Sequence, residues 1–355
     1  MLNLSHKPET IVAPRGRILV TGGAGFIGSH TVVALLEAGY EPILLDNFSN
    51  SQPIVLERLH RLTGQPVVCL EADCVEGVAL LPRLEKLHAQ APFVGIIHFA
   101  AYKAVGESVA HPLRYYHNNL ASLSSVLHWM QVLGIANLVF SSSCTVYGQP
   151  DALPVHEGSA LQPPNSPYGH TKLMGEQMIR DVVAATPGMR AVLLRYFNPI
   201  GAHPTALIGE LPLGRPNNLV PYLTQAAAGW IPPLTVFGTD YPTPDGTAVR
   251  DYIHVCDLAS GHVKALEALP ALPEACMPVN LGMGEGVSVQ QLIDTFAAAT
   301  GVPVPHVAGP RRAGDVAMIY ARNTLATTAL GWAPQYTLAD SLRHAWAWQQ
   351  QLPKP

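Results

Sequence analysis

The sequence predicts an α/β fold in which a doubly wound parallel sheet is followed by a smaller α/β C-terminal domain. Three observations lead to this prediction. Short, continuously apolar strands alternate with helical segments over residues 17–198, as in parallel β-α units covered on both faces. A glycine-rich turn separates the first strand from the first helix. Beyond residue 198 the chain is rich in Pro and Gly, which is typical of loops carried on a rigid scaffold.

The composition is that of a globular chain with one large domain or two modest ones. The chain has 355 residues, of which 48% are hydrophobic and only 13% charged, and its formal net charge is −4. Since an average domain has about 25% charged residues, a solvating disordered chain is excluded. A charge-poor, mildly acidic protein also lacks the basic face on which generic DNA or RNA binding depends, so we expect no nucleic-acid partner.

Targeting, cysteine and histidine patterns narrow the cellular context. No run of about 18 apolar residues occurs, and residues 1–16 have no apolar signal-peptide core, so we expect no membrane association and a flexible N-terminal tail. Five cysteines without a C-x-x-C pair argue against a disulfide framework and favour a reducing compartment, the cytoplasm. The 15 histidines show no H-x-x-x-H spacing, so we predict no metal site.

The expected elements follow the chain in order. RILVT forms a strand that stops at glycines, SHTVVALLEAG forms a helix over residues 29–39, and EPILLDN forms the second strand. Further strands are expected at 67–73, 94–101, 136–143 and 189–198, with helical stretches at 118–134 and 168–185. We place a domain boundary near residue 198. The helical stretches 287–300 and 338–351 are expected to pack back against the first domain.

The glycine-rich turn has the features of a dinucleotide site. Gly22, Gly25 and Gly28 form G-x-x-G-x-x-G between a strand and a helix, where a tight turn and a missing Cβ let a pyrophosphate approach the helix N-terminus. Asp46 ends the second strand, where its carboxylate can accept hydrogen bonds from the adenosine ribose. An Asp there repels a 2′-phosphate and no Arg follows in DNFSNS, so NAD is favoured over NADP. Asp73, at the end of the third strand, either addresses adenine or caps a helix.

Three residues form a candidate catalytic group. Tyr168 and Lys172 are spaced i, i+4, so both project from one face of a helix. This helix follows SSSCTVYG, where a strand ends at the ligand-binding edge of the sheet. A tyrosine base near neutral pH needs nearby positive charge, which Lys172 and a nicotinamide cation would supply, and Ser143 would hold the same substrate oxygen. The alternative is a serine-rich strand end beside an exposed helical Tyr/Lys pair.

These motifs resemble the extended short-chain dehydrogenase/reductase family, and within it the UDP-glucose 4-epimerases. The resemblance rests on TGGAGFIG, on Ser143, Tyr168 and Lys172, and on the segments HFAAYKAVGES, SPYGHTKLMGEQ, LRYFNPIGAHP and VRDYIHVCDLA, and it runs from Arg17 to the C-terminus. It implies an NAD-binding Rossmann domain at 17–198 and a UDP-sugar-binding domain at 199–355. It also implies an isomerase of galactose metabolism that interconverts UDP-galactose and UDP-glucose through a 4-keto sugar, with hydride passing to and from tightly bound NAD.

The resemblance also implies residue roles. Further contacts to NAD are expected from Phe26, Ile27, Asn47, Asp73, Cys74, Phe99, Ala100, Lys103, Asn118, Ser141, Tyr168, Lys172 and Phe197. Contacts to the UDP-sugar are expected from Lys103, Ser143, Tyr168, Asn198, Asn218, Leu219, Phe237, Arg250, Tyr252, Arg312, Asp315 and Ile319. Forked Arg donors suit a diphosphate, although Arg250 and Arg312 also fit ordinary surface salt bridges. A homodimer is expected through the helices around 114–133 and 168–186, unless their apolar faces are buried against the sheet.

Three departures from the pattern of these relatives, and one position whose size matters, bear on the site. Phe26 replaces a frequent Tyr, and Ala101-Tyr102 replace the usual small/apolar pair, which adds bulk before Lys103. Cys144 stands where Ala is usual, and without a partnering His it is expected to pack rather than act as a nucleophile. Ile319 occupies the position whose bulk governs whether a 2-acetamido sugar fits, and its intermediate size leaves acceptance of UDP-N-acetyl sugars open.

Three other functions compete with the epimerase. A nucleotide-sugar 4,6-dehydratase shares fold and cofactor but uses an Asp-Glu pair after the triad Ser/Thr, where this chain has Cys144 and Thr145. An NAD-dependent sugar dehydrogenase must release its reduced cofactor at each turnover. A non-catalytic NAD-binding sensor usually lacks a member of the triad, whereas this sequence keeps all three residues.

Overall fold

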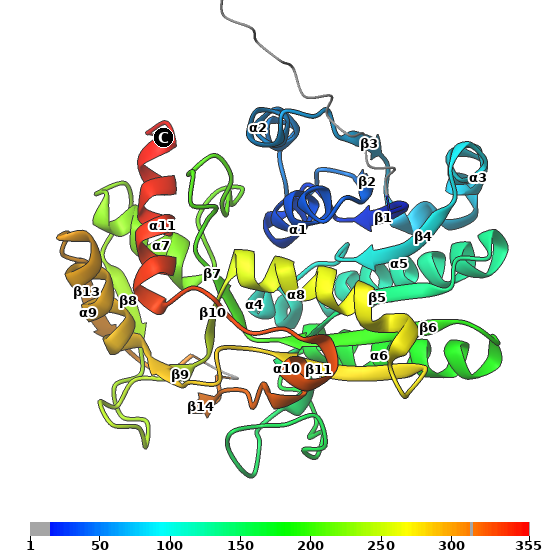
Figure 1. Cartoon of the computed structure of the whole chain (residues 1–355). Coiled ribbons are helices and arrows are strands. Elements are labelled where there is room, and N and C mark those ends of the chain that lie inside the picture. The colour runs from blue at the N-terminus through cyan, green and yellow to red at the C-terminus, as the bar shows by residue number, and fades with distance from the viewer. Residues whose placement is uncertain (1–14, 313–314, 355) are drawn as a thin grey trace, which may run out of the picture.

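The computed structural model describes residues 15–312 and 315–354, so all but two residues of the predicted tail 1–16 lie outside the described residues. Within this part of the chain seven parallel strands form one sheet in the order β11-β6-β5-β4-β1-β2-β3 (Figure 1). The predicted doubly wound parallel sheet is thus confirmed. The strands are β1 (Arg17–Thr21), β2 (Glu41–Asp46), β3 (Val68–Glu71), β4 (Phe93–His98), β5 (Asn137–Ser143), β6 (Arg190–Tyr196) and β11 (Cys276–Leu281).

Helices cover both faces of this sheet because successive strand residues point to opposite sides. In β5, Val139 packs with one hydrophobic cluster, while Leu138 and Phe140 pack with the other. Helices on the first face are α1 (Phe26–Glu37), α2 (Ile54–Thr63), α8 (Val255–Ala268) and α10 (Thr324–Leu330). The second face is covered by the 3-10 helix η1 (Cys74–Leu80) and by α3 (Leu81–Gln90), α5 (Pro112–Leu133) and α6 (Pro167–Ala185). Short α4 (Val105–Ala110) contacts α5 and α6.

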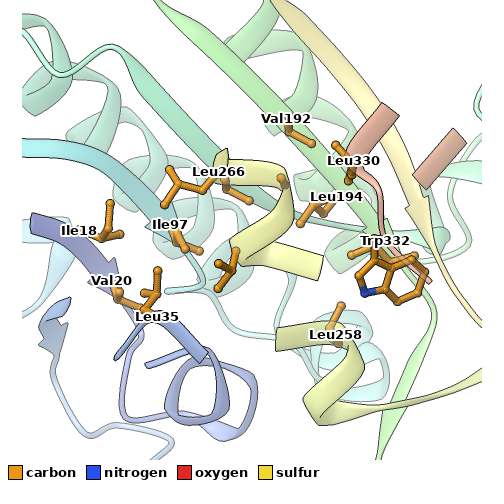
Figure 2. Close-up of a cluster of buried hydrophobic side chains, with 14 of the residues drawn as sticks. Ile18, Val20, Leu35, Ile97, Val192, Leu194, Leu258, Leu266, Leu330 and Trp332 are labelled. Atoms are coloured by element: carbon orange, nitrogen blue, oxygen red, sulfur yellow. The ribbon is translucent and has the colours of Figure 1, made fainter. Parts of the chain in front are cut away.

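The first face forms a continuous apolar layer between the sheet and α8. Figure 2 shows Val192 and Leu194 of β6 close to Leu330 and Trp332, and Leu258 and Leu266 on α8. Each of these six residues is at most 6% exposed. This buried layer holds α8 and α10 against the sheet.

A second group of elements lies at one side of the sheet, on the left of Figure 1. Its core joins α7 (Leu219–Ala227), α9 (Val289–Thr300) and α11 (Leu338–Gln351). Short strands connect it: β7 (Asn198–Ile200) pairs with β10 (Tyr252–His254), β8 (Leu234–Phe237) pairs with β13 (His306–Gly309), and β9 (Val249–Arg250) lies between β12 (Val287–Ser288) and β14 (Met318–Ile319). No helix among the described residues is both long and apolar enough to cross a membrane.

Two details differ from the sequence predictions. The helix predicted at 29–39 begins three residues earlier, at Phe26, because Gly25 already serves as its N-cap. The stretches 287–300 and 338–351 pack mainly on each other and on α7, while β11, α8 and α10 are the elements that extend the first sheet and its cover. The strand β11 comes from the part of the chain after residue 198, yet it pairs with β6 in the first sheet. The domain boundary near residue 198 therefore stays a prediction.

Candidate active site

A cavity of about 640 Å³ lies at the carboxyl edge of the sheet. Its size falls in the range of about 300–1,000 Å³ that small-molecule sites occupy. Every residue predicted to contact the cofactor lines it, namely Gly22, Gly25, Phe26, Ile27, Gly28, Asp46, Asn47, Asp73, Cys74, Phe99, Ala100, Lys103, Asn118, Ser141, Tyr168, Lys172 and Phe197. The parallel topology brings these residues together because all its strands end at this edge.

The glycines of the turn between β1 and α1 meet different demands. Gly22 has φ +70°, and a Cβ on Gly28 would lie 2.3 Å from the carbonyl oxygen of Gly22, so both positions are required by the protein's own backbone. A Cβ on Gly25 would meet only the Gly22 oxygen, at 3.3 Å, and Gly25 lines the cavity. Gly25 therefore leaves space for a ligand at the start of α1, which no side chain among the described residues caps.

Two carboxylates stand at the ends of β2 and β3. Asp46 accepts hydrogen bonds from the backbone N–H groups of Ala24 and Phe48, both at 2.9 Å, so its carboxylate is held beside the glycine turn. Asp73 is the N-cap of η1 and also accepts from Asn47 at 2.8 Å. Asp73 thus caps a helix and still lines the cavity, so the two roles considered for it are compatible.

The first turn of α6 carries Tyr168 to the cavity wall. Ser166 caps the helix by accepting from the Gly169 N–H at 3.2 Å, and Pro167 fills the first helical position. One turn later, the Nζ atom of Lys172 lies 5.8 Å from the centre of the Tyr168 ring. Ser143 ends β5 against the same cavity, so the predicted catalytic group is assembled in one place.

Burial shifts the pKa values of both titratable groups. It raises the pKa of Tyr168 to about 12, and the contact with Ser143 only partly opposes this rise. Burial also lowers the pKa of Lys172 to about 7. A phenol with so high a pKa is a poor base at neutral pH, so this site needs added positive charge before Tyr168 can accept a proton.

Ser141 and Cys144, close to Ser143 in the sequence, interact with neighbouring residues of the protein. The Ser141 hydroxyl hydrogen-bonds the Tyr196 hydroxyl, and the Ser141 carbonyl accepts from Lys172. Burial raises the pKa of Cys144 to about 12, although the charge of Arg250 partly opposes this effect. The Cys144 thiol is therefore a poor nucleophile, consistent with the packing role expected for it.

The residues predicted for the UDP-sugar fall into two sets. Besides Lys103, Ser143 and Tyr168, Asn198 and Asn218 line the cavity. The others lie outside its lining: Leu219, Phe237, Arg250, Tyr252, Arg312, Asp315 and Ile319. Most residues of this second set contact one another, and these contacts lie beside the residues of the first set.

A cluster of charges joins that second set. Asp315 pairs with Arg312 at 2.9 Å and with Arg250 at 3.9 Å, and the Arg312 guanidinium lies 5.9 Å from the centre of the Phe237 ring. Tyr252 is buried in β10 directly opposite Asn198 of β7. This pairing connects the charged cluster with the cavity wall.

Ile319 lies in a small apolar cluster with Phe197 and partly buried Cys144. Both of these neighbours line the cavity. Ile319 therefore lies behind the cavity wall without lining the cavity itself. Among the described residues no group of three or more His, Cys, Asp or Glu side chains could hold a metal ion.

The sequence profile of the NAD dependent epimerase/dehydratase family matches residues 18–282. The chain belongs to this family. A UDP-glucose 4-epimerase from Bos taurus is 49% identical over 343 residues, covering 95% of this chain and 97% of the relative. Among solved structures, a UDP-glucose-4-epimerase from Stenotrophomonas maltophila with bound NAD and formylated UDP-arabinopyranose has a TM-score of 0.90, 46% identity and coverage of 95% and 98%. One from Bifidobacterium longum, with NAD+ and UDP, has a TM-score of 0.90, 45% identity and coverage of 95% and 99%.

For this member of the epimerase family, sequence reasoning missed Glu210. One carboxylate oxygen of Glu210 accepts from Lys103 at 3.0 Å and from Asn218 at 2.6 Å, and all three residues line the cavity. A lone Glu in a Pro- and Gly-rich loop gives no periodic or motif signal. Only the fold of that loop against the segment after β4 brings it to Lys103.

Proposed function

We propose that the protein is an NAD-dependent UDP-glucose 4-epimerase that interconverts UDP-galactose and UDP-glucose. The observation that carries this proposal is that one and the same cavity is lined by the Gly22–Gly28 turn and by Ser143, Tyr168 and Lys172. The near-full-length similarity to UDP-glucose 4-epimerases supports the same reaction. In such a reaction the sugar is oxidised and reduced again within one site, so no net redox change results.

The residues present fit NAD. The open space beside Gly25 and the N-terminus of α1 suit a pyrophosphate, since free backbone N–H groups attract anions. The carboxylate of Asp46 suits ribose hydroxyls, and it would repel a 2′-phosphate. Directly after Asp46 the cavity wall is formed by neutral side chains, Asn47, Ser49, Asn50, Ser51 and Gln52. Arg58 also lines the cavity further along, but its guanidinium donates to the Leu207 carbonyl at 3.2 Å and lies over the Trp348 ring. We therefore propose NAD rather than NADP as cofactor.

We assign the proton chemistry to the three residues at the end of β5 and the start of α6. NAD held along the Gly22–Gly28 turn and Asp46 would supply the hydride acceptor and donor for C4 of the sugar. Tyr168 removes the proton from the 4-hydroxyl at its Oη atom and later gives it back. Ser143 holds the same oxygen, and the positive charge of Lys172 favours the phenolate form of Tyr168.

The uridine diphosphate is proposed to lie between the cavity and the charged cluster beside it. Arg250 and Arg312 supply forked donors suited to a diphosphate, and Phe237, which is 44% exposed, offers a ring for stacking on uracil. Asn198, Asn218, Leu219, Tyr252 and Asp315 complete the proposed contacts, and Lys103 reaches from the cofactor side. Acceptance of a 2-acetamido group is proposed to depend on Ile319.

We also propose a cytoplasmic homodimer. Val109 of α4 and Leu113 of α5 are 62% and 81% exposed, and Met174 of α6 is 48% exposed. Exposed apolar residues on helices that contact one another are typical of an interface. The five cysteines are all free, which fits a reducing compartment.

The proposed activity is tested without added cofactor. The purified protein is gel-filtered and mixed with UDP-galactose, and UDP-glucose is followed by NMR. Formation of UDP-glucose to a stable ratio without net NADH would support an epimerase that retains its NAD. Product that forms only after NAD is added would contradict tight retention, and no product even with NAD would overturn the assignment. A parallel run with UDP-N-acetylgalactosamine measures what Ile319 allows.

A further inference from the structure

Two consecutive residues of β5 each form a hydrogen bond with a different residue of α6. The Ser141 carbonyl accepts from Lys172 Nζ at 2.6 Å, and the Ser142 hydroxyl donates to Glu176 Oε1 at 2.6 Å. The next residue, Ser143, lines the same cavity as Tyr168 and partly opposes the rise in the pKa of that tyrosine. Because Tyr168, Lys172 and Glu176 are spaced four residues apart, they share one face of α6. Tyr168 and Lys172 are the proposed catalytic pair, and Glu176 lies one turn deeper.

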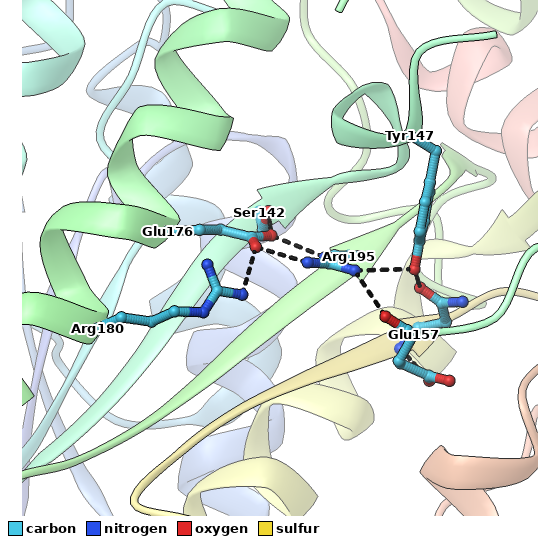
Figure 3. Close-up of polar contacts among 7 residues, drawn as sticks. Ser142, Tyr147, Glu157, Glu176, Arg180 and Arg195 are labelled. Carbon is cyan, nitrogen blue, oxygen red and sulfur yellow. Dashed lines mark hydrogen bonds and ion pairs between the residues drawn. The ribbon is translucent and has the colours of Figure 1, made fainter. Parts of the chain in front are cut away.

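Glu176 is held more firmly than either of its two partners on the helix. Its side chain is fully buried and takes two hydrogen bonds from Arg195, Nε to Oε1 at 2.8 Å and Nη2 to Oε2 at 2.7 Å (Figure 3). Arg180, one turn further along α6, donates to Oε2 at 2.9 Å. Burial acts to raise the pKa of Glu176, but the hydrogen bonds and charges of Arg195, Ser142 and Arg180 together outweigh it, so the net pKa is lowered and the carboxylate stays ionised.

Arg195 in turn is fixed to the sheet. It lies on β6 directly opposite Ser142 of β5, so Glu176 bridges two paired strands from the helix above them. Its Nη1 atom donates to the Tyr147 hydroxyl at 3.2 Å, and that hydroxyl donates to Asn280 of β11 at 2.6 Å (Figure 3). The anchor of α6 therefore reaches across three neighbouring strands, β5, β6 and β11.

This ion pair interrupts an apolar layer. Phe140 and Leu193, two residues before Ser142 and Arg195 on their strands, point to the same face and belong to the core under α6. Desolvating a buried carboxylate and guanidinium costs several kcal/mol, roughly what their attraction returns, so well-packed apolar residues would serve stability equally well. Apolar contacts do not fix the orientation of their partners. A bidentate Arg–carboxylate pair, by contrast, fixes both the distance and the angle between its two side chains.

We propose that Glu176 is a positioning residue which, through Arg195 and Ser142, sets where α6 holds Tyr168 and Lys172 over the end of β5. The inference rests on the roles proposed above for those two residues. Catalysis requires the reacting atoms to lie within a few tenths of an ångström of their working geometry, and a shift of about 1 Å can cost roughly 100-fold in rate. Glu176 lies outside the cavity lining, so it acts only through the helix.

The test compares Glu176→Gln and Ser142→Ala with a matched control, Asp257→Asn. Asp257 is also a buried carboxylate, 1% exposed, but it lies on α8, where it accepts from the backbone N–H groups of Gln335 and Tyr336. Each variant is assayed for kcat and KM with UDP-galactose, for the pH profile of kcat, for retained NAD and for thermal midpoint. Tyr168→Phe is included to test the proposed catalytic role itself.

Glu176→Gln is expected to lower kcat roughly 10- to 100-fold and to shift the pH profile, with KM changed less than about threefold and NAD retained. Asp257→Asn is expected to lower the thermal midpoint without moving kcat or the pH profile. Wild-type kcat and pH profile in Glu176→Gln would overturn the inference. If that variant does not fold, Ser142→Ala decides: a fall in kcat of about threefold or more supports the inference, and a wild-type value overturns it. Full activity in Tyr168→Phe would instead overturn the catalytic assignment on which it rests.

Discussion

The carbonyl oxygen of Ser141 accepts a 2.6 Å hydrogen bond from the Nζ atom of Lys172. This contact ties the proposed catalytic lysine to the strand that ends at Ser143, so the lysine and the serine are held by one element. The same Nζ atom lies 5.8 Å from the centre of the Tyr168 ring. The serine assigned to a cofactor contact thus has a structural task as well.

Replacing Tyr168 by Phe should remove turnover and leave the cofactor bound. The phenol is the proton acceptor, so its loss should lower kcat by about 10²- to 10⁴-fold, whereas the ring that lines the cavity remains. NMR of UDP-galactose conversion measures the rate, and absorbance of nucleotide released on denaturation measures the NAD. If the protein were a non-catalytic sensor, the parent protein would already show no turnover. Its nucleotide binding would then be the same in the parent protein and in Tyr168→Phe.

Lys172 should make stability depend on pH between about 7 and 10.5. Burial lowers its pKa from 10.5 to about 7, so in this window the unfolded chain binds the extra proton. Below pH 7 the buried amine is charged, and its desolvation lowers the free energy of unfolding by the full amount. As the pH rises to 10.5 this penalty disappears, so the free energy of unfolding rises with pH. Relative to Lys172→Met, the parent should gain about 1–2 kcal/mol between pH 7 and pH 9 in denaturant titrations. Parallel stability curves for the two proteins would refute the lowered pKa.

Two alanine substitutions in the glycine turn should have different effects. Gly28→Ala places a Cβ 2.3 Å from the Gly22 oxygen, so it should destabilise the fold by about 1–3 kcal/mol. Gly25→Ala meets that oxygen at 3.3 Å and otherwise points into the cavity, so the thermal midpoint of the NAD-free protein should change little. Its retained NAD should fall instead. Equal NAD content in Gly25→Ala and the parent protein would argue against a pyrophosphate at this turn.

Glu210→Gln should tighten the binding of UDP. The carboxylate now offsets the Lys103 charge at 3.0 Å, and its removal leaves that charge free for a diphosphate. Because Lys103 is half-exposed, the stability change should stay below about 1 kcal/mol. Calorimetry should show UDP binding roughly threefold tighter at low salt, with the difference shrinking at high salt. Asp240→Asn, which breaks an exposed pair with Arg311, is the matched control and should leave UDP affinity unchanged. Weaker binding in Glu210→Gln would mean that Glu210 positions Asn218 rather than limits the positive charge.

Local patterns predicted most of the sheet and one wall of the site. The apolar runs from RILVT to MRAVLLRYFN correspond to β1 through β6, and each cofactor residue predicted from the strand ends lines one cavity. This succeeds because parallel strands all end at one edge, so sequence order alone places Gly25, Asp46 and Ser143 together. The start of α1 was missed by three residues because its N-cap is a glycine that also belongs to the turn.

The amino-acid sequence by itself determined the fold class, the dinucleotide turn and the Ser143, Tyr168 and Lys172 group, since these follow from spacing along single strands and helices and from the shared edge at which parallel strands end. Only the tertiary structure decided that β11 completes the sheet, that Glu210 meets Lys103, and that Glu176 meets Arg195 and Ser142. Those contacts join segments up to 107 residues apart. Their formation depends on how whole layers pack, because the energy of burying apolar faces, not any local pattern, brings such distant side chains within hydrogen-bonding distance.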